Sequence, residues 1–577
     1  MATSVLDSID TASTRVLLGG LLLAGIAYVI YRSILPRPLE GIPYNVSATN
    51  HILGDLPEIK AFGSMTDWLA KQPAKHKSPI FQFFVRPFSK PWVVVADYHE
   101  AADICTQRLK EFDKGTASTA VFSGVVPRAH ITLRSSDPQF RKNKELVRNL
   151  MTPSFLNEVS APEIYDKMTR LVELWSLKSE HANGRFFSAS RDVHNAALDI
   201  IVCASFGIDT QSTQLVREIQ QLSPDDNSKD DPDGEFVFKE ATMNEELEAL
   251  TVLAESVAKT FKTPSPPLFH FLYRNLSSTL RHAFSLTKQL QDREIKNGIK
   301  RRQNGEALKC ALDEVSIREE ALAKKEGRKP DYYSQVITSE MMNYLIAGHE
   351  STSSAIRWGI SYLSADQRVQ NELRSALQQA HHQAKAERRP PTLAEILHTR
   401  VPYLDAVCEE IFRLSYPFGM SLREASVDTQ ILGARVPKGT TIVFLSNGPS
   451  VLAPPISYDQ SRSSEWVRSR KTKQTVNEEY EYAGFIPERW LKKATGTDGK
   501  EEAVFDSQAF PMQTFGLGPR GCFGRKMAYL EMKLFFSLVP WTFEMLELPP
   551  QLATPKPVSS LTRNPDRVFI KTKQVVL

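Results

Sequence analysis

Residues 515–524, Phe-Gly-Leu-Gly-Pro-Arg-Gly-Cys-Phe-Gly, constrain the fold of this chain more than any other stretch. Four glycines and a proline in ten residues exclude the interior of a helix or strand, so the backbone must turn tightly and approach another group closely. The amphipathic residues 525–536 predict a helix, whose N-terminal amides and dipole favour an anion. Cys522 stands just before that helix, and this setting predicts a lowered thiol pKa.

A thiolate in a glycine-rich loop suits a metal ion, and glycine lets a flat cofactor lie against the backbone. Arg520 is available for a cofactor carboxylate, so haem is the candidate cofactor. An ordinary buried cysteine is the alternative, because free Cys packs as a small hydrophobe. The spacing favours haem, since the loop resembles the Phe-x-x-Gly-x-Arg-x-Cys-x-Gly signature of the cytochrome P-450 haem-thiolate family. The matching residues are Phe515, Gly518, Arg520, Cys522 and Gly524.

The charge balance and the cysteines narrow the possible function classes. The net charge is +4 over 577 residues, which is too weak to predict nucleic acid as a partner. The five cysteines are scattered and include no Cys-x-x-Cys pair, which argues against a disulfide framework and a cysteine zinc site. A reducing compartment that faces the cytosol fits this pattern best.

The N-terminal residues predict one membrane-spanning helix. Residues from Val16 to Tyr31 are almost all apolar, and the run extends to Leu35 if the Arg32 side chain reaches the interface. Its length of about 20 residues is what a bilayer requires. A signal peptide is the alternative, but acidic residues precede the run and no clear cleavage site follows it. Residues 1–35 are therefore predicted to be a membrane anchor.

Charges and prolines beside the anchor predict where the rest of the chain lies. Two arginines follow the apolar run closely and one precedes it, so the positive-inside rule places the remainder in the cytosol. Three prolines between residues 36 and 43 exclude a continuous helix. Residues 36–45 are therefore predicted to form a stiff proline-rich hinge between the anchor and the body.

Apolar periodicity predicts a small sheet and many helices in the remaining chain. A run without proline and with helical spacing predicts one long helix from Asp331 to Ser364. The other predicted elements are the paired strands Phe81–Val85 and Trp92–Val95, a helix over Asp137–Leu156, a hairpin over Ile431–Phe444 with its turn at Pro437–Gly439, and loops over Asp225–Asp233 and Ser457–Glu479.

The long helix carries polar residues that an apolar helix does not need. Gly348, in Ala347-Gly-His-Glu-Ser-Thr352, costs about 1 kcal/mol in a helix interior. Gly348 could let a ligand approach the helix, while Glu350, Ser351 and Thr352 offer groups that handle protons. The alternative is structural, because Ser and Thr in helices often bond back to a backbone carbonyl.

A carboxylate and two guanidinium groups predict a structural triad. Glu410 and Arg413 lie three residues apart on one face of a predicted helix and alone would form a surface ion pair. Arg489, in Phe485-Ile-Pro-Glu-Arg-Trp490, would let one Glu bind two arginines. Such a triad would fix the segment before the cysteine loop to that helix.

These pieces together resemble the cytochrome P-450 family over nearly the whole chain. The resemblance implies a mostly α fold with a small β region (α+β), with residues 46–577 as a single haem-thiolate monooxygenase domain, although length alone predicts several domains. It also implies haem b, with Cys522 as the axial ligand whose thiolate favours cleavage of dioxygen. The other residues that it carries over are Arg423 and Arg520 for the propionates, Glu410, Arg413 and Arg489 as the triad, and Ala347, Gly348, Glu350, Ser351 and Thr352 on the oxygen side.

Two positions depart from the family's pattern. The family often has Trp-x-x-x-Arg in the helix before the haem, with both residues near a propionate, and the matching residues here are Phe140 and Lys144. The family's usual Thr in the proton-relay position is Ser351 here, with Thr352 next to it. Both residues retain a hydroxyl, so oxygen activation is still expected.

The resemblance implies a monooxygenase that inserts one atom of dioxygen into a lipophilic small molecule. No flavin or nicotinamide motif occurs in the chain, so electrons are expected from NADPH through a separate reductase, with cytochrome b5 as a second candidate donor. The anchor and the family imply a single-pass protein of the endoplasmic reticulum membrane. The chain is similar in style to filamentous-fungal members, which often act in secondary-metabolite biosynthesis.

Two alternatives remain open at this point. A haem-thiolate isomerase, dehydratase or phenol-coupling catalyst would need no oxygen insertion. A non-catalytic haem-binding membrane adaptor would need no acid or hydroxyls on the long helix, and retention of Glu350, Ser351 and Thr352 argues against it. Turnover with a reductase would distinguish these classes.

Overall fold

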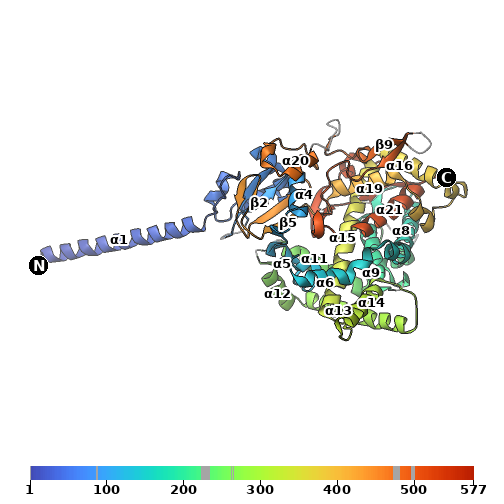
Figure 1. The fold of residues 1–577 in the computed structure, drawn as a ribbon, viewed down its shortest axis with the longest axis horizontal. Helices are drawn as coiled ribbons and strands as arrows, with labels where there is room; N and C mark the ends of the chain where they lie inside the picture. Colours follow the sequence, from blue (N-terminus) through green and yellow to red (C-terminus); the bar gives the residue numbers. More distant parts are fainter. Residues whose placement is uncertain are drawn as a thin grey trace.

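The structure, a computed structural model, describes residues 2–85, 89–208, 210–222, 234–261, 263, 265–471, 481–495 and 501–577. Helix α1 (Ala2–Ile34) extends away from the rest of the chain, as Figure 1 shows. Its apolar stretch Val16–Ile34 is long and apolar enough to cross a membrane, and none of it is buried. Its 19 residues, at about 1.5 Å each, match the thickness of about 30 Å of a bilayer's hydrocarbon core.

The proline-containing segment after α1 is hydrogen-bonded to the body. The Gln82 side chain donates to the carbonyl oxygens of Leu39 (2.8 Å) and Ile42 (2.7 Å). It also accepts the Leu39 N–H at 2.8 Å. Near the end of α1, the Tyr31 hydroxyl donates to the Asn50 carbonyl oxygen at 3.0 Å. The segment that was predicted as a hinge is therefore attached to the sheet.

A five-stranded sheet lies between α1 and the helical body (Figure 1). Its order is β1-β2-β8-β5-β3, and only β2 and β8 are parallel neighbours within it. The predicted strand pair occurs here as β1 and β2. The parallel pair β2 and β8 is rich in Val, Ile and Phe, which suits burial on both faces. The strands are β1 (Ile80–Phe83), β2 (Trp92–Val95), β8 (Thr441–Leu445), β5 (Met420–Ala425) and β3 (Phe112–Asp113).

The hairpin predicted over Ile431–Phe444 is wrong in its turn and its strands. Strand β6 (Thr429–Ile431) pairs with β7 (Ala434–Val436), and the two residues between them, 432 and 433, both have positive φ. This is the backbone of a tight two-residue hairpin turn. The segment Pro437–Gly439 leads instead into β8, which belongs to the large sheet.

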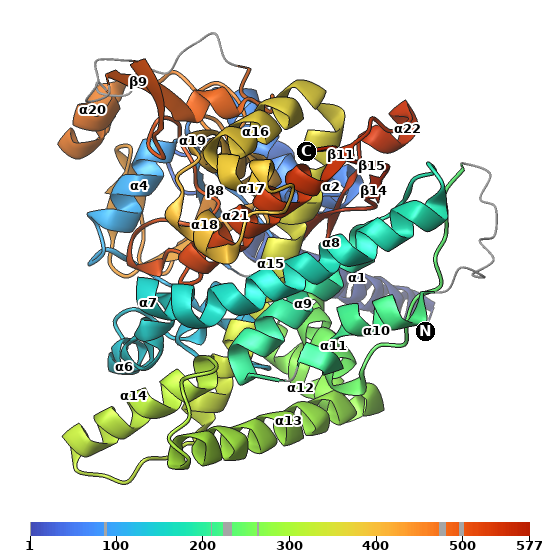
Figure 2. The ribbon, with the colours of Figure 1, turned by 90° about the vertical axis from the view of Figure 1, so that its right-hand side faces the viewer.

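Helix α15 (Gln335–Ala365) crosses the middle of the helical body, with α8 (Ala161–Ala182), α9 (Ser190–Phe206) and α21 (Arg525–Thr542) around it (Figure 2). The Ser334 side chain accepts the Ile337 N–H and so caps its start. Helix α19 (Pro402–Ser415) packs against it as well. Apolar side chains of these helices form the largest core cluster, so α15 supplies a rigid base for its polar residues.

The helix predicted over Asp137–Leu156 is divided in the structure. Helix α6 (Pro138–Val147) is followed by a 3-10 turn over Arg148–Met151 and by the short α7 (Pro153–Phe155). Pro153 cannot donate a backbone hydrogen bond and disfavours a helical conformation at the residue before it. The prediction overlooked this proline.

The remaining elements complete the body and its rim. Helix α20 (Glu465–Lys471) forms within the stretch predicted as a loop over Ser457–Glu479 and packs on α4. The predicted loop over Asp225–Asp233 lies outside the described residues. The other helices are α2 (Leu56–Phe62), α3 (Met65–His76), α4 (Tyr98–Thr106), α5 (Thr116–Phe122), α10 (Gln214–Gln221), α11 (Glu245–Thr260), α12 (Pro266–Leu276), α13 (Ser278–Gln303), α14 (Ala311–Glu326), α16 (Gln367–Ala380), α17 (His382–Ala386), α18 (Leu393–His398) and α22 (Pro550–Ala553). The other strands are β4 (Phe187–Ser188), β9 (Leu491–Thr495), β10 (Glu501–Phe505), β11 (Phe543–Met545), β12 (Pro557–Ser559), β13 (Arg563–Pro565), β14 (Phe569–Ile570) and β15 (Thr572–Gln574).

Candidate functional site

The loop before α21 is held in shape by its own backbone. The Cys522 N–H donates to the Phe515 carbonyl oxygen at 2.7 Å, and the Gly521 N–H donates to that of Gly518 at 2.9 Å. Gly518 has a φ of +68°, and a Cβ at this position would lie 1.9 Å from the carbonyl oxygen of Cys105 on α4. Only glycine fits here, because any side chain would collide with the backbone of α4.

Cys522 has an exposed side chain, whereas the other four cysteines are buried. Protein atoms nevertheless crowd the thiol, and this burial raises its pKa even though the backbone N–H groups of Gly524 and Arg525 lower it in part. The predicted lowering of the thiol pKa is therefore wrong for the protein alone, because desolvation outweighs the start of the helix. A metal ion beside the thiol would offset this effect and favour the thiolate.

Four cationic side chains from separate elements converge beside the cysteine loop. Burial, Arg520 and Arg423 lower the pKa of Lys114, which follows β3, and burial and Arg520 lower the pKa of Lys144 on α6. Burial and Arg423 lower the pKa of Arg520 to about 10. No ion pair joins any of the four to a carboxylate in the part of the chain that the structure describes. The cluster therefore carries excess positive charge.

Arg520 lies at the centre of this cation cluster. Its Cζ is 4.2 Å from the centre of the Phe140 ring, and its Nη2 donates to the His130 carbonyl oxygen at 3.4 Å. Its Nη1 is buried and has no hydrogen-bond partner among the described residues. Lys144 Nζ lies 5.7 Å from the centre of the same ring and 3.4 Å from the Pro519 carbonyl oxygen. A buried, unpartnered guanidinium nitrogen among like charges favours an anionic ligand, and two carboxylates such as haem propionates fit it.

Lys114 is the member of this cluster that the sequence did not predict. Strand β3 pairs Phe112 and Asp113 with Ala425 and Glu424 of β5, and this pairing brings Lys114 beside Arg423. The local sequence Asp-Lys-Gly is that of an ordinary turn. Only the pairing of two distant strands reveals the position of this lysine.

One turn of α15 is accessible to solvent, and we call the space beside it the opening. Ala347 is exposed and Ser351 is half-buried, although most of the helix is buried. The Ser351 hydroxyl donates to the Ala347 carbonyl oxygen at 2.8 Å. A hydroxyl that donates to a carbonyl can still accept a second hydrogen bond. Ser351 is therefore placed to hold a polar group at this opening.

Thr352 faces the core and not this opening. Its residue is 3% exposed, and its hydroxyl lies beside the carboxyl group of Glu531 on α21. Burial raises the pKa of Glu531 to about 8, and the Thr352 hydroxyl offsets part of that effect. Of the two neighbouring hydroxyls, Ser351 is the one that bonds back to a backbone carbonyl.

Gly348 and Glu350 face the neighbouring helix α9. A Cβ on Gly348 would lie 2.5 Å from Cδ1 of Ile201, so glycine allows the two helices to pack closely. This packing gives a structural reason for the glycine, and the approach of a ligand to Gly348 stays a prediction. The Glu350 carboxylate lies 3.7 Å from Nε2 of His349 and 3.9 Å from Nδ1 of His194, two residues that the sequence analysis did not single out.

The Glu410 carboxylate joins the residues predicted as a triad. Arg413 donates to it through Nε (2.8 Å) and Nη2 (2.7 Å), and Arg489 donates through Nε (3.0 Å). The Trp490 indole N–H (2.9 Å) and the Ile486 backbone N–H (3.0 Å) also donate to it. The side chains of Glu410, Arg413 and Arg489 are fully buried. The triad thus attaches residues 486–490 to α19.

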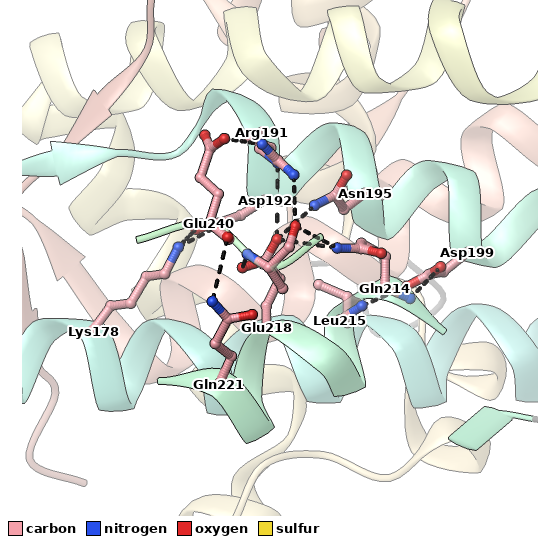
Figure 3. Close-up of polar contacts among 11 residues, drawn as sticks. Lys178, Arg191, Asp192, Asn195, Asp199, Gln214, Leu215, Glu218, Gln221 and Glu240 are labelled. Carbon is pink, nitrogen blue, oxygen red and sulfur yellow. Dashed lines mark hydrogen bonds and ion pairs between the residues drawn. The ribbon is translucent and has the colours of Figure 1, made fainter. Parts of the chain in front are cut away.

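A second polar cluster lies where α8, α9 and α10 meet (Figure 3). Lys178 pairs with Asp192 at 2.7 Å, and Asp199 accepts the backbone N–H groups of Gln214 (2.9 Å) and Leu215 (2.8 Å) at the start of α10. Burial raises the pKa of Asp199 to about 7. A cavity of about 270 Å³ adjoins the cluster. Because its charged groups bind one another, this cluster stabilises the junction of the helices.

Comparisons with known proteins agree with this geometry. A family model described as Cytochrome P450 matches residues 48–449 and 483–572. Cytochrome P450 monooxygenase TRI13 of Fusarium sporotrichioides is 33% identical over 95% of this chain and 98% of its own length. Cytochrome P450 monooxygenase xilC of Penicillium rubens is 34% identical over 93% of this chain and 92% of its own length.

Two further comparisons concern a relative that matches part of the chain and a solved structure that matches nearly all of it. The Hps1-dma1 cluster cytochrome P450 monooxygenase cyp3.1 of Dothistroma septosporum is 38% identical over 46% of this chain and 86% of its own length. A crystal structure of a cytochrome P450, CYP102L1, covers 94% of this chain and all of its own chain, with a TM-score of 0.66 and 18% identity. The predicted mostly helical fold with a small β region is therefore confirmed.

Proposed function

Because this chain belongs to the cytochrome P450 family and is a haem-thiolate monooxygenase, we propose that Cys522 is its axial ligand and that it oxidises a lipophilic small molecule. The bound haem supplies the redox chemistry, in which one atom of dioxygen enters the substrate and the other leaves as water. The observation that carries the assignment of the site is the convergence of Lys114, Lys144, Arg423 and Arg520 beside Cys522, where Asp113 is the one carboxylate that acts on Arg520 among the described residues.

Each cation has a proposed role toward the haem propionates. Arg520 and Arg423 bind them as the resemblance predicts, and the unpartnered Nη1 of Arg520 supports this role. Lys144 stands where the family often has Arg. Together with Lys114 it supplies further positive charge toward the propionates. The Phe140 ring supports the Arg520 guanidinium from the side. The shape of the cysteine loop, which lets a flat cofactor approach its backbone, depends on Phe515, Gly518 and Gly524.

The α15 residues are proposed to hold and move protons. Ser351 lies at the opening beside Ala347, and its hydroxyl would turn away from the Ala347 carbonyl oxygen, to which it donates here, in order to donate to the reacting oxygen. Glu350 is half-buried and supplies protons to this region from the α9 side. Thr352 supports α15 from the core through Glu531 and has the lesser catalytic effect. The triad of Glu410, Arg413 and Arg489 keeps residues 486–490, which precede the cysteine loop, attached to α19.

The substrate class, the electron donor and the location are parts of the same proposal. Electrons come from NADPH through a separate reductase, since the chain carries no flavin or nicotinamide motif. The apolar α1 anchors the enzyme in the endoplasmic reticulum membrane with its body in the cytosol. Membership of a named cluster by one relative supports a role in secondary-metabolite biosynthesis.

The test uses the full-length protein with and without Cys522. The reduced wild-type protein should give the long-wavelength carbon monoxide band of a haem-thiolate protein, and Cys522→Ala should abolish it. A surviving band would refute the assignment of the ligand. With a reductase and NADPH, candidate lipophiles should yield products that are one oxygen heavier. Substrate turnover without consumption of dioxygen would instead favour isomerase or dehydratase chemistry.

A further inference from the structure

We propose that His194, His349 and Glu350 form a binding site for a divalent transition-metal ion such as Zn²⁺ between α9 and α15. Their ligand atoms lie within 4.8 Å of one another. A Glu350 carboxylate oxygen is 3.7 Å from Nε2 of His349 and 3.9 Å from Nδ1 of His194. Two imidazoles and one carboxylate are a common donor set for zinc and leave one coordination position for water.

His349 is held in the form that binds a metal. Its Nδ1 lies 3.1 Å from the carbonyl oxygen of Leu345, which can only accept, so Nδ1 carries a hydrogen and the lone pair of the neutral ring is on Nε2. That Nε2 is buried and has no hydrogen-bond partner in the described part of the chain. Metal-bound histidines are commonly oriented by such a backbone carbonyl. The lone pair thus points at Glu350 from a fixed ring.

An ion pair between Glu350 and protonated histidines is the competing interpretation. A charge-assisted N–H···O bond is about 2.7–2.9 Å long, whereas the Glu350 oxygen lies 3.7 Å from Nε2 of His349 and 3.9 Å from Nδ1 of His194. These separations are too long for hydrogen-bonded ion pairs and leave room for an ion between the ligand atoms. The nearby Arg357 donates to the Asn564 side-chain oxygen at 2.7 Å, so its guanidinium is directed to another partner.

The geometry needs only a small closure to hold the ion. With bonds of about 2.0–2.1 Å and tetrahedral angles, ligand atoms lie about 3.4 Å apart. The 3.7 and 3.9 Å separations can reach that value by rotation of the Glu350 side chain. The two ring nitrogens lie within 4.8 Å of each other and can approach by rotation of the half-buried His194 side chain. The side chains of His194 and Glu350 are 19% and 16% exposed, so an ion can enter from solvent.

Occupation of the site would affect catalysis through Glu350. This consequence rests on the proposed function, in which Glu350 supplies protons. Zinc would hold the carboxylate in its coordination sphere and prevent it from carrying a proton. We therefore expect Zn²⁺ to divert NADPH consumption from product to hydrogen peroxide, and a chelator to reverse the effect.

The test measures zinc on the full-length, haem-loaded protein in detergent. Calorimetric titration with ZnCl₂ should show a site that His194→Ala weakens by at least about 100-fold, since even supporting residues of metal sites contribute 10–100-fold. The matched control is His282→Ala, because His282 is exposed on α13, and it should bind like the wild type. Absorption at the zinc K-edge should show two imidazole ligands in the wild type and loss of this signature in His194→Ala.

The outcomes separate the metal site from the proposed function. The absence of zinc binding, or equal binding by wild type and His194→Ala, would overturn the site. A Glu350→Gln variant tested by the same titration should also bind more weakly, and unchanged affinity would count against the site. If zinc binds as expected while coupling is unchanged, the metal site is supported and the proton role of Glu350 is refuted. Neither calorimetry nor zinc absorption depends on turnover.

Discussion

Glu410→Gln should destabilise the fold more than the loss of a surface ion pair. The buried carboxylate accepts five hydrogen bonds, two from Arg413 and one each from Arg489, Trp490 and the Ile486 N–H. The Gln amide nitrogen is a donor and would face donors, while two buried guanidinium groups would lose their counter-charge. Removing one partner of a buried ion pair costs about 3–5 kcal/mol. We expect a loss in the free energy of unfolding of this size.

Urea unfolding of the haem-loaded protein, followed by tryptophan fluorescence and haem absorbance, measures this loss. The matched control is Asp292→Asn, because Lys288 and Asp292 pair at 2.8 Å with side chains 75% and 40% exposed. That exposed pair should contribute about 0.5 kcal/mol or less. If Glu410→Gln does not fold, Arg489→Lys is the second variant to measure. It keeps the positive charge, so its loss in the free energy of unfolding should be smaller than about 3–5 kcal/mol. A loss equal to that of the control would refute the argument that the triad holds the segment before the cysteine loop.

Two further predictions concern the proton path and the anchor. Ser351→Ala should keep haem and substrate binding but divert NADPH consumption into hydrogen peroxide, lowering coupled turnover by about 10²–10⁴-fold, with Thr352→Ala milder. Assays of hydrogen peroxide check this. If Ser351→Ala still couples NADPH consumption to product and Thr352→Ala does not, the two roles are reversed. Deletion of residues 2–35 should leave a domain that retains haem and no longer sediments with membranes. A soluble truncated chain without haem would show that the anchor contributes to the fold.

Sequence-based prediction worked where a signal lies within one continuous segment. The cysteine loop could be predicted because five spaced residues encode a single turn before one helix, and α15 because its apolar spacing continues for 31 residues. The division at Pro153 was also visible in the sequence, and the predicted helix ignored it. The hairpin error has another origin, because Pro437–Gly439 is a true turn whose strands belong to different sheets.

Residues that depend on tertiary pairing could not be predicted. Lys114 reaches the cation cluster only because β3 pairs with β5, and His194 reaches Glu350 only because α9 packs on α15. Gly348 shows the same limit, since the requirement for glycine comes from Ile201 on a neighbouring helix. One sequence contains no information on such neighbours until the helices and strands are assembled.

The hydrogen bonds of Gln82 shorten the free chain between α1, the candidate membrane anchor, and the body. Leu35, the first residue after α1, is buried, and Leu39 is bound to Gln82, so the chain is attached to the body directly after α1 ends at Ile34. With α1 in a bilayer, such a short connection prevents the body from tumbling independently of the membrane. It would keep one side of the body facing the lipid, so that a lipophile could pass into the enzyme by lateral partitioning without crossing bulk water. The effective substrate concentration would then be set by the lipid phase and not by aqueous solubility.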